Sequence, residues 1–166
     1  MPKGFLLPLS PVSPAWSNAV PKFIAYTRVS TAEQAKEGYS LSAQLKACRE
    51  EYERTLAEYP DLEFVHREER GQSAWKLKFS NRPTGREVEA ELQPGDHLCF
   101  TRLNRAFRKT SDCLTMIERW EKRGIIIHVC QLHSHTKMHY YTNDPVAKFI
   151  LTVMAAVDEL DSSMKA

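Results

Sequence analysis

The amino-acid sequence predicts an α/β fold with a mainly parallel central sheet flanked by helices. Short apolar segments without internal Gly or Pro alternate along the chain with longer segments whose apolar residues recur at helical spacing. Strands and helices that alternate in this way form right-handed βαβ units around a parallel sheet. The length of 166 residues and the hydrophobic content of 42% suit a single core.

The first half of the sequence predicts two strands and one long helix. Residues 23–28 form a β-rich run, and Ser40 can cap a helix over residues 40–59, where apolar side chains recur every three or four positions. A second strand is expected over residues 62–66. The segment 69–82 is polar and contains Gly, Ser and Asn, so we expect a mobile loop there.

The second half predicts two helices, each followed by a strand. Residues 84–92 favour a short helix, and a turn containing Pro and Gly precedes a third strand over 98–100. Side chains at 110–112 can cap the next helix, which Gly124 ends before a fourth strand over 125–129.

A final helix with a different apolar pattern follows. Asp144 suits its N-cap position and Pro145 its first turn. Its apolar residues repeat in steps of three and four, which is typical of a coiled-coil seam. Two interpretations stay open: the seam binds a partner, or the helix packs on its own sheet. Phe149 and Met154 widen the stripe enough for both. The seam consists of Val146, Ile150, Val153, Val157, Leu160 and Met164.

Three regions are expected on this basis. Residues 1–21 hold five prolines and resemble a flexible leader, 22–142 form the α/β domain, and 143–166 form the start of a long oligomerisation helix. The leader lacks the apolar core of a signal peptide, and no segment has the roughly 20 apolar residues that cross a bilayer. We therefore expect a soluble, cytoplasmic protein with no membrane partner.

Cysteine and histidine spacing gives no metal motif. No two of the four cysteines form a Cys-x-x-Cys pair, so we expect them to be small core residues in a reducing compartment. His133, His135 and His139 have ligand-like spacing but no nearby cysteine or carboxylate. We therefore expect no metal and no cofactor. The net charge of +2 means that a polyanion would be met by a local basic patch. The cysteines are Cys48, Cys99, Cys113 and Cys130.

The segment that carries the clearest chemical signal is residues 26–31. Ser30 comes directly after the predicted first strand, at the kind of strand end where open parallel sheets place their chemistry. Arg28 lies two residues earlier, so both side chains share one side of an extended chain. A hydroxyl beside a guanidinium suggests attack on an anion. The alternative is an ordinary serine that caps a turn.

Three further segments extend this signal, and together they resemble the catalytic domain of the serine recombinases, which include resolvases, invertases and large serine integrases. The segments are residues 40–44, 82–83 and 103–108, in the family's order and at plausible spacing. The resemblance covers the chain from about residue 23 to its end and implies a resolvase-like fold with a C-terminal oligomerisation helix.

The resemblance also implies a mechanism and partners. Ser30 would attack a DNA phosphodiester to give a 5′-phosphoserine link and a free 3′-hydroxyl, Gln44 would help position the phosphate, and strand exchange and religation would follow. Family members act on DNA as homodimers that pair into tetramers. Planar guanidinium groups suit the developing negative charge, so no metal would be required. The cations implied around the phosphate are Arg28, Arg82, Arg105 and Arg108.

One residue departs from the family pattern. Asn104 stands directly before Arg105, where the family usually has aspartate. An amide holds a neighbouring arginine less strongly than a carboxylate and cannot relay a proton, so we expect reduced activity. If residues 104–109 are helical, Arg105 and Arg108 lie one turn apart on one face, and Phe107 anchors the segment.

Alternative functions stay open. The family's separate DNA-binding region is not in this sequence, which together with Asn104 would suit a catalytically impaired oligomerisation or DNA-scaffolding protein. The arginines would then only contact phosphates, and Gln44 would be a surface residue of its helix. A phosphoesterase acting on small metabolites is disfavoured, because no Gly-rich phosphate loop or activating histidine stands near Ser30.

Overall fold

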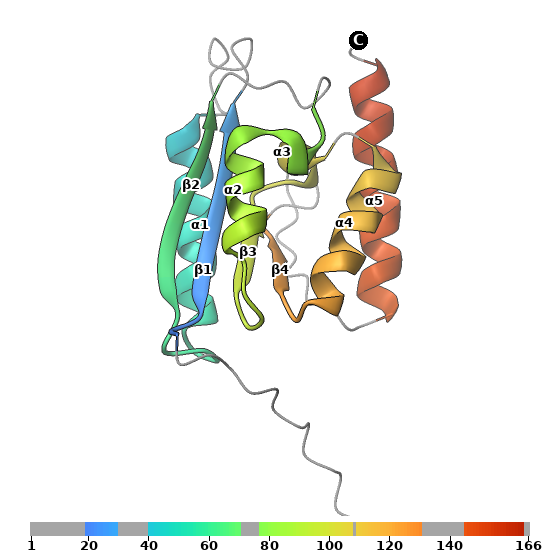
Figure 1. The fold of residues 1–166 in the computed structure, drawn as a ribbon. Helices are drawn as coiled ribbons and strands as arrows, with labels where there is room; N and C mark the ends of the chain where they lie inside the picture. The colour runs from blue at the N-terminus through green and yellow to red at the C-terminus, as the bar shows by residue number, and fades with distance from the viewer. Residues whose placement is uncertain (1–18, 30–39, 71–76, 108, 131–144, 165–166) are drawn as a thin grey trace, which may run out of the picture.

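The computed structural model contains the expected parallel sheet. It describes residues 19–29, 40–70, 77–107, 109–130 and 145–164. Four parallel strands lie in the order β2-β1-β3-β4, so the chain crosses from one side of β1 to the other after β2 (Figure 1). The strands are β1 (Lys22–Val29), β2 (Glu63–Arg70), β3 (His97–Phe100) and β4 (Ile126–Val129).

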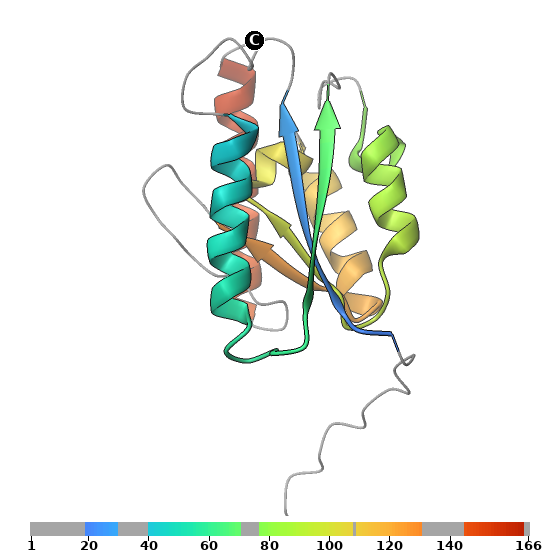
Figure 2. The same ribbon diagram turned by 90° about the vertical axis from the view of Figure 1, so that its left-hand side faces the viewer.

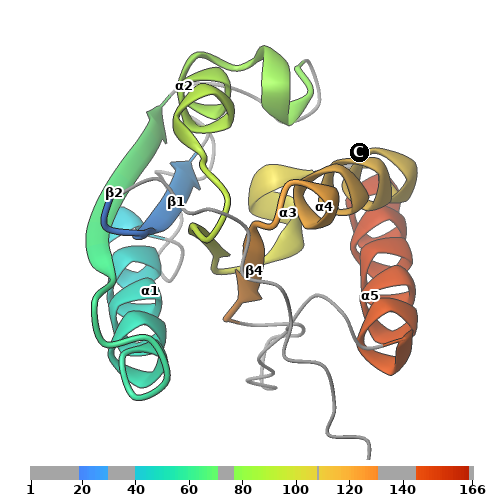
Figure 3. The ribbon, with the colours of Figure 1, turned by 60° about the horizontal axis from the view of Figure 1, so that its bottom comes forward.

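Helices cover both faces of the sheet, as Figures 2 and 3 show. Helix α1 packs on one face, whereas α2, α4 and α5 contribute buried side chains to the core on the other. Helix α5 lies against α3 and α4. The helices are α1 (Leu41–Thr55), α2 (Pro83–Glu91), α3 (Leu103–Ala106), α4 (Thr110–Lys122) and α5 (Pro145–Met164), with a 3-10 turn η1 (Phe79–Asn81) before α2.

Strand β1 is buried on both faces because it has neighbours on both sides and helices above and below. Phe23 and Ala25 join the core under α1, while Ile24 and Tyr26 join the opposite core. Arg28 lies two residues after Tyr26, on the same face of the strand, and is also fully buried. The end of this strand therefore carries a charged group into the interior.

Strand β2 is longer than the sequence predicts. It continues past residue 66 to Arg70, so the expected loop over 69–82 is wrong at its start. An edge strand needs no continuous apolar run, because it has only β1 beside it. Its charged side chains find partners outside the sheet: both guanidinium ends of Arg67 donate at 2.8 Å to the Glu91 carboxylate of α2.

The ends of α1 follow local chemistry. Ser40 is the N-cap, as predicted, and its hydroxyl accepts a hydrogen bond from the Ala43 N–H at 3.2 Å. The helix ends at Thr55 instead of residue 59. The last residues of the expected helix form a turn, in which the Tyr59 N–H still reaches the Thr55 carbonyl at 2.9 Å. This turn places the Tyr59 ring edge-on to His97.

The two ends of α4 differ in how well the sequence predicts them. Gly124 adopts a φ of 74° after the helix, and the Ile125 N–H returns to the Trp120 carbonyl at 3.0 Å, which is a Schellman motif. The N-cap is Lys109, not one of residues 110–112. The Thr110 N–H and hydroxyl instead donate to Glu159 of α5, at 2.8 and 2.6 Å.

Several expected features lie outside the described residues: most of the leader over 1–21, the helix start at Asp144, and the histidines at 133, 135 and 139. Helix α5 begins at Pro145, in agreement with the prediction that Pro145 occupies its first turn. Among the helices that the structure describes, none combines the length and apolar character needed to cross a membrane.

We predict that Gly85→Ala destabilises the fold. A Cβ at position 85 would lie 2.1 Å from the Phe79 carbonyl oxygen, and a backbone atom cannot give way as a flexible side chain can. We expect a loss of about 1–3 kcal/mol in the free energy of unfolding, measured by urea denaturation. Glu87→Ala is the control, because it puts alanine at an exposed position of the same helix. Equal stability of the two variants would contradict the close approach.

Candidate active site

The candidate site lies at the carboxyl edge of the sheet, where the strand order reverses between β1 and β3. Ligands of open α/β sheets bind at such a switch point. Arg28 is the penultimate residue of β1, and α3 with Arg105 follows β3 almost directly. Both residues are buried, at 0% and 4% exposure. The topology thus brings together two arginines that lie far apart in the sequence.

The backbone carbonyl of Arg105 joins the guanidinium groups of two other arginines. Arg28 Nε donates to this oxygen at 2.9 Å, and Arg82 Nη1 donates to it at 3.2 Å. Arg82 Nη2 donates to the next carbonyl, that of Ala106. The guanidiniums of two sequence-predicted arginines therefore converge on a short backbone segment that contains a third, Arg105.

Arg82 donates to four protein acceptors. Its Nε donates to the Leu77 carbonyl at 3.1 Å, and Nη1 also reaches the Tyr26 hydroxyl at 3.2 Å. Burial raises the pKa of Tyr26 to about 12, although Arg82 opposes this shift. The phenol therefore stays neutral at ordinary pH and acts as an acceptor. Arg82 is 1% exposed, so in this conformation a phosphate cannot reach it.

Gln44 is a buried residue that holds the end of β1. Its Oε1 accepts from the Arg28 N–H at 3.2 Å, and its Nε2 donates to the Arg28 carbonyl at 3.0 Å. The interpretation of Gln44 as a surface residue of its helix is wrong, because its exposure is 6%. The side chain joins the first turns of α1 to the backbone two residues before Ser30.

The described residues do not form the continuous helix over 104–109 that is the condition for placing Arg105 and Arg108 on one face. Helix α3 is a single turn that ends at Ala106, and Phe107 is extended, with φ −127° and ψ 155°. The carbonyls at 105 and 106 accept from Arg82 and Arg28, and Phe107 is buried against Phe79, Phe100 and Trp120, as expected of an anchor. These interactions favour a turn over a longer helix. The helical argument for pairing Arg105 with Arg108 therefore does not hold.

The side-chain oxygen of Asn104 accepts no hydrogen bond from an arginine in the part of the chain that the structure describes. Its Oδ1 is buried and has no hydrogen-bond partner there. The expected hydrogen bond from an arginine to this amide is thus absent from the described residues. Ser30 and Arg108 both lie outside them, and β1 ends at Val29, the residue before Ser30.

Glu69 is a buried carboxylate of this region that sequence reasoning did not select. It is the cross-strand partner of Arg28 in the register of β1 and β2, and its exposure is 2%. Its Oε2 accepts from the Gly85 N–H in the first turn of α2 at 3.1 Å, where the helix dipole favours an anion. The sequence predicts that the second strand ends at residue 66, so it does not place Glu69 in the sheet beside the first strand.

A second polar cluster lies on the sheet face under α1. The sulfurs of Cys48, Cys99 and Cys130 come within 4.8 Å of one another, so these cysteines are core residues, as expected, but are not separate. The thiols of Cys48 and Cys99 donate toward Cys130, which lowers the pKa of Cys130. Beside them His128 contacts His97 at 2.8 Å, and burial lowers the pKa of His97 to about 3.

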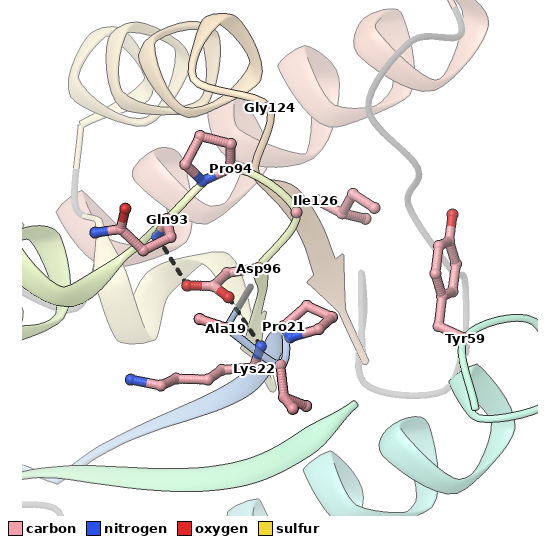
Figure 4. Close-up of a pocket in the computed structure, with 11 residues that line it drawn as sticks. Ala19, Pro21, Lys22, Tyr59, Gln93, Pro94, Asp96, Gly124 and Ile126 are labelled. Carbon is pink, nitrogen blue, oxygen red and sulfur yellow. Dashed lines mark hydrogen bonds between the residues drawn. The ribbon is translucent and has the colours of Figure 1, made fainter. Parts of the chain in front are cut away.

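A cavity of about 430 Å³ lies at the opposite, amino-terminal edge of the sheet (Figure 4). Its lining is mainly apolar, with Pro21, Pro94 and Ile126 among the residues. The Asp96 carboxylate there is bound to the backbone N–H groups of Lys22 and Gln93, both at 2.8 Å. Asp96 thus ties the start of β1 to the turn that follows α2, and none of the candidate catalytic residues lines this cavity.

Comparison with known proteins gives consistent matches. Residues 23–166 match a family model described as "Resolvase, N terminal domain". A protein named "Resolvase" from Clostridium perfringens (strain 13 / Type A) is 30% identical over 142 residues, which is 85% of this chain and 64% of that protein. The chain therefore spans less than two thirds of this curated relative.

Two solved structures are also similar. The N-terminal catalytic domain of TP901-1 integrase is 20% identical, with a TM-score of 0.53 over 87% of this chain and 99% of that one. A resolvase family site-specific recombinase from Streptococcus pneumoniae is 21% identical, with a TM-score of 0.47 over 87% and 92%. The likeness to the integrase domain identifies the fold.

We predict that Arg82→Lys destabilises the fold although it keeps the charge. A lysine ammonium is a compact donor that cannot reach the four acceptors of the planar guanidinium at once. We expect a loss of roughly 2–4 kcal/mol in urea denaturation. Arg86→Lys, an exposed position one turn further along the same helix, should change stability by less than about 0.5 kcal/mol. Equal effects at the two positions would contradict the described contacts.

Proposed function

Because the chain belongs to the resolvase family, whose N-terminal domain it matches, we propose that it is the catalytic domain of a site-specific DNA recombinase with Ser30 as nucleophile. The observation that best supports this proposal is the convergence of Arg28 and Arg82 on the Arg105 carbonyl at the sheet's switch point. Ser30 follows the end of β1 directly in the sequence.

In the proposed reaction the Ser30 hydroxyl oxygen attacks a DNA phosphorus in line. A new P–O bond forms to the serine, the bond from phosphorus to the 3′ oxygen breaks, and the proton lost by the serine balances the one gained by the 3′-hydroxyl. The phosphoserine ester keeps the energy of the diester, so a second 3′-hydroxyl can reverse the step and reseal the DNA without ATP. The arginines would stabilise the charge on the phosphorus oxygens.

The buried guanidiniums set a condition on this reaction. Arg28 Nε and both terminal nitrogens of Arg82 now donate to backbone carbonyls, so a phosphate that takes these donors has to replace the carbonyls of Arg105 and Ala106 as acceptor. We propose that DNA binding moves α3 and exchanges these acceptors. A phosphate oxygen is the stronger acceptor, because it carries a full charge. The described conformation is then the closed state of the site.

The same contacts favour a second candidate function. A buried guanidinium that donates to four protein acceptors, as Arg82 does, also suits a fold that binds DNA as a scaffold without cleaving it. The amide at Asn104, in place of the family's usual carboxylate, favours the same reading. Trapping of a covalent protein–DNA adduct distinguishes the two functions, because only the recombinase forms one.

Helix α5 offers an assembly surface for the proposed recombinase. Leu151 and Ala155 are buried against the chain's own core, and Ile150 and Met154 pack partly against it. The opposite side carries large exposed apolar residues, three of which belong to the seam seen in the sequence. We propose that this stripe binds a second copy of the chain. The exposed residues are Phe149, Val153, Leu160 and Met164.

We predict a covalent DNA adduct that depends on Ser30. The chain is incubated with labelled suicide duplexes, nicked and of randomised sequence because the recombination site is unknown, and then run on a denaturing gel. Ser30→Ala should abolish the adduct, whereas Ser111→Ala, which removes an exposed hydroxyl elsewhere, should keep it. DNA binding without any adduct in the parent chain would support the scaffold function. An adduct that survives Ser30→Ala would contradict the proposed nucleophile.

We predict that Asn104→Asp increases cleavage of supercoiled plasmid. A carboxylate could accept a charge-assisted hydrogen bond from an arginine, about twice as strong as a hydrogen bond to an amide, and it could exchange a proton. The initial rates of nicking by the parent and the variant are compared at equal protein concentration. An unchanged rate would mean that the missing charge does not limit the reaction.

We predict that Leu160→Glu weakens self-association. A carboxylate in the middle of the exposed stripe would have to lose its water when two copies meet. Sedimentation equilibrium should give a dissociation constant at least about tenfold higher than that of the parent. Lys148→Glu changes the charge more but lies off the stripe, so it should leave association unchanged. A parent chain that stays monomeric at high concentration would exclude α5 as a sufficient interface.

A further inference from the structure

Three buried thiols meet on the sheet face that α1 covers. Cys48 belongs to α1, Cys99 to β3, and Cys130 follows the last residue of β4. Their exposures are 0%, 0% and 5%, and all three sulfurs lie within 4.8 Å of one another. The sulfur atoms of Cys99 and Cys130 lie 3.5 Å apart. The fourth cysteine, Cys113, lies in the core on the other face.

We propose that Cys48, Cys99 and Cys130 bind a divalent thiophilic metal ion of the Zn²⁺ class. This site is separate from the proposed reaction, because the sheet stands between it and the arginines. Each sulfur comes from a different element, so an ion there would join α1, β3 and β4. Its expected effect is on the stability of the fold.

The spacing of the sulfurs fits such an ion with small movements. Zinc binds thiolate sulfur at about 2.3 Å, so sulfurs around one ion lie about 4 Å apart. One pair lies 3.5 Å apart, and all three distances are within 4.8 Å. Side-chain rotations that move each sulfur by roughly half an ångström would bring all three distances to that value.

The ligand set and the charge both point to a divalent ion. Three cysteine sulfurs without oxygen ligands select soft ions over Mg²⁺ or Ca²⁺. When the ion binds, the three thiols release three protons to solvent. A divalent ion then leaves one negative charge in the core, whereas Cu⁺ would leave two, and each buried charge is costly. Three protein ligands leave the fourth position of a tetrahedral ion to water.

Polar side chains next to the thiols complete the surroundings expected of a metal site. His128 lies two residues before Cys130 on the same strand face, and it is hydrogen-bonded to Glu51 at 2.9 Å and to His97 at 2.8 Å. His128 and Glu51 act electrostatically on Cys130. Both ring nitrogens of His128 are engaged, so the histidine orients its neighbours and is not itself a ligand.

The first experiment uses the unaltered chain, purified under reducing conditions. It is titrated with Co²⁺, and Zn²⁺ is then added as competitor. We expect one Co²⁺ per chain with sulfur-to-cobalt charge-transfer absorption, which one equivalent of Zn²⁺ removes. X-ray absorption of the zinc form should show three sulfur neighbours at about 2.3 Å. Only nitrogen and oxygen neighbours would place the ion elsewhere, for example at His133, His135 and His139, and would overturn the proposal.

Variants then test the ligands one at a time. Cys99→Ala and Cys130→Ala should each weaken Zn²⁺ binding at least about tenfold. Removing a residue that only hydrogen-bonds to a ligand already lowers metal affinity by that factor, and a ligand itself contributes more. Cys113→Ala is the matched control, because it removes a buried cysteine outside the cluster and should keep full affinity. Circular dichroism confirms that each variant is folded. Equal loss in all three variants, or oxidation of the parent to a disulfide that Zn²⁺ does not prevent, would overturn the proposal.

The metal site and the proposed recombinase activity can fail separately. Ser30→Ala should bind Zn²⁺ like the parent, because Ser30 belongs to neither the ligand set nor the elements that carry it. A chain that binds zinc but forms no DNA adduct would keep the metal site and exclude the nuclease step. A chain that forms the DNA adduct but does not bind zinc would exclude only the metal site.

Discussion

The backbone carbonyl of Arg105 is the acceptor on which the carboxyl edge of the sheet depends. It takes hydrogen bonds from Arg28 on β1 and from Arg82 at the start of α2. Two like charges in a buried region repel each other, and they stay together because the carbonyl dipoles of residues 105 and 106 lie between them. If Arg82 leaves, the carbonyls of Leu77 and Ala106 lose their donor, whereas the Arg105 carbonyl is shared by both guanidiniums. The strand end before Ser30, the start of α2 and the turn of α3 are therefore held as one unit.

The alternation of β1 gives the molecule two chemically different interiors. Tyr26 and Arg28 point to the face of α2 and α4, where a neutral phenol and guanidinium groups gather. Phe23 and Ala25 point to the face of α1, where thiols and histidines are buried together. A sheet with one polar cluster on each face can bind an anion on one side and a soft cation on the other without the two charges cancelling. We therefore expect the proposed DNA cleavage and the proposed metal binding to respond independently to mutation.

Local signals in the sequence predict most elements, because their causes are local: Ser40 caps α1, and Gly124 takes the left-handed conformation that ends α4. The predictions are wrong where a residue distant in the sequence determines the local structure. Strand β2 extends beyond its apolar segment because β1 pairs with its charged end, and α3 ends early because Arg82 donates to its carbonyls. At the site, residue types indicated the arginines, but the register partner Glu69 and the meeting of three cysteines depend on strand order, which residue spacing does not reveal.

The most direct test of this account is hydrogen exchange of arginine Nε–H groups, followed by NMR on the free chain. Arg28 Nε–H is bound to the Arg105 carbonyl and Arg82 Nε–H to the Leu77 carbonyl, and both side chains are buried. We expect these two protons to exchange at least about a hundredfold more slowly than the Nε–H of the exposed Arg86, because exchange requires local opening. Exchange of all three at the same rate would mean that the guanidiniums are not held at the Arg105 carbonyl, and the proposed closed site would not exist.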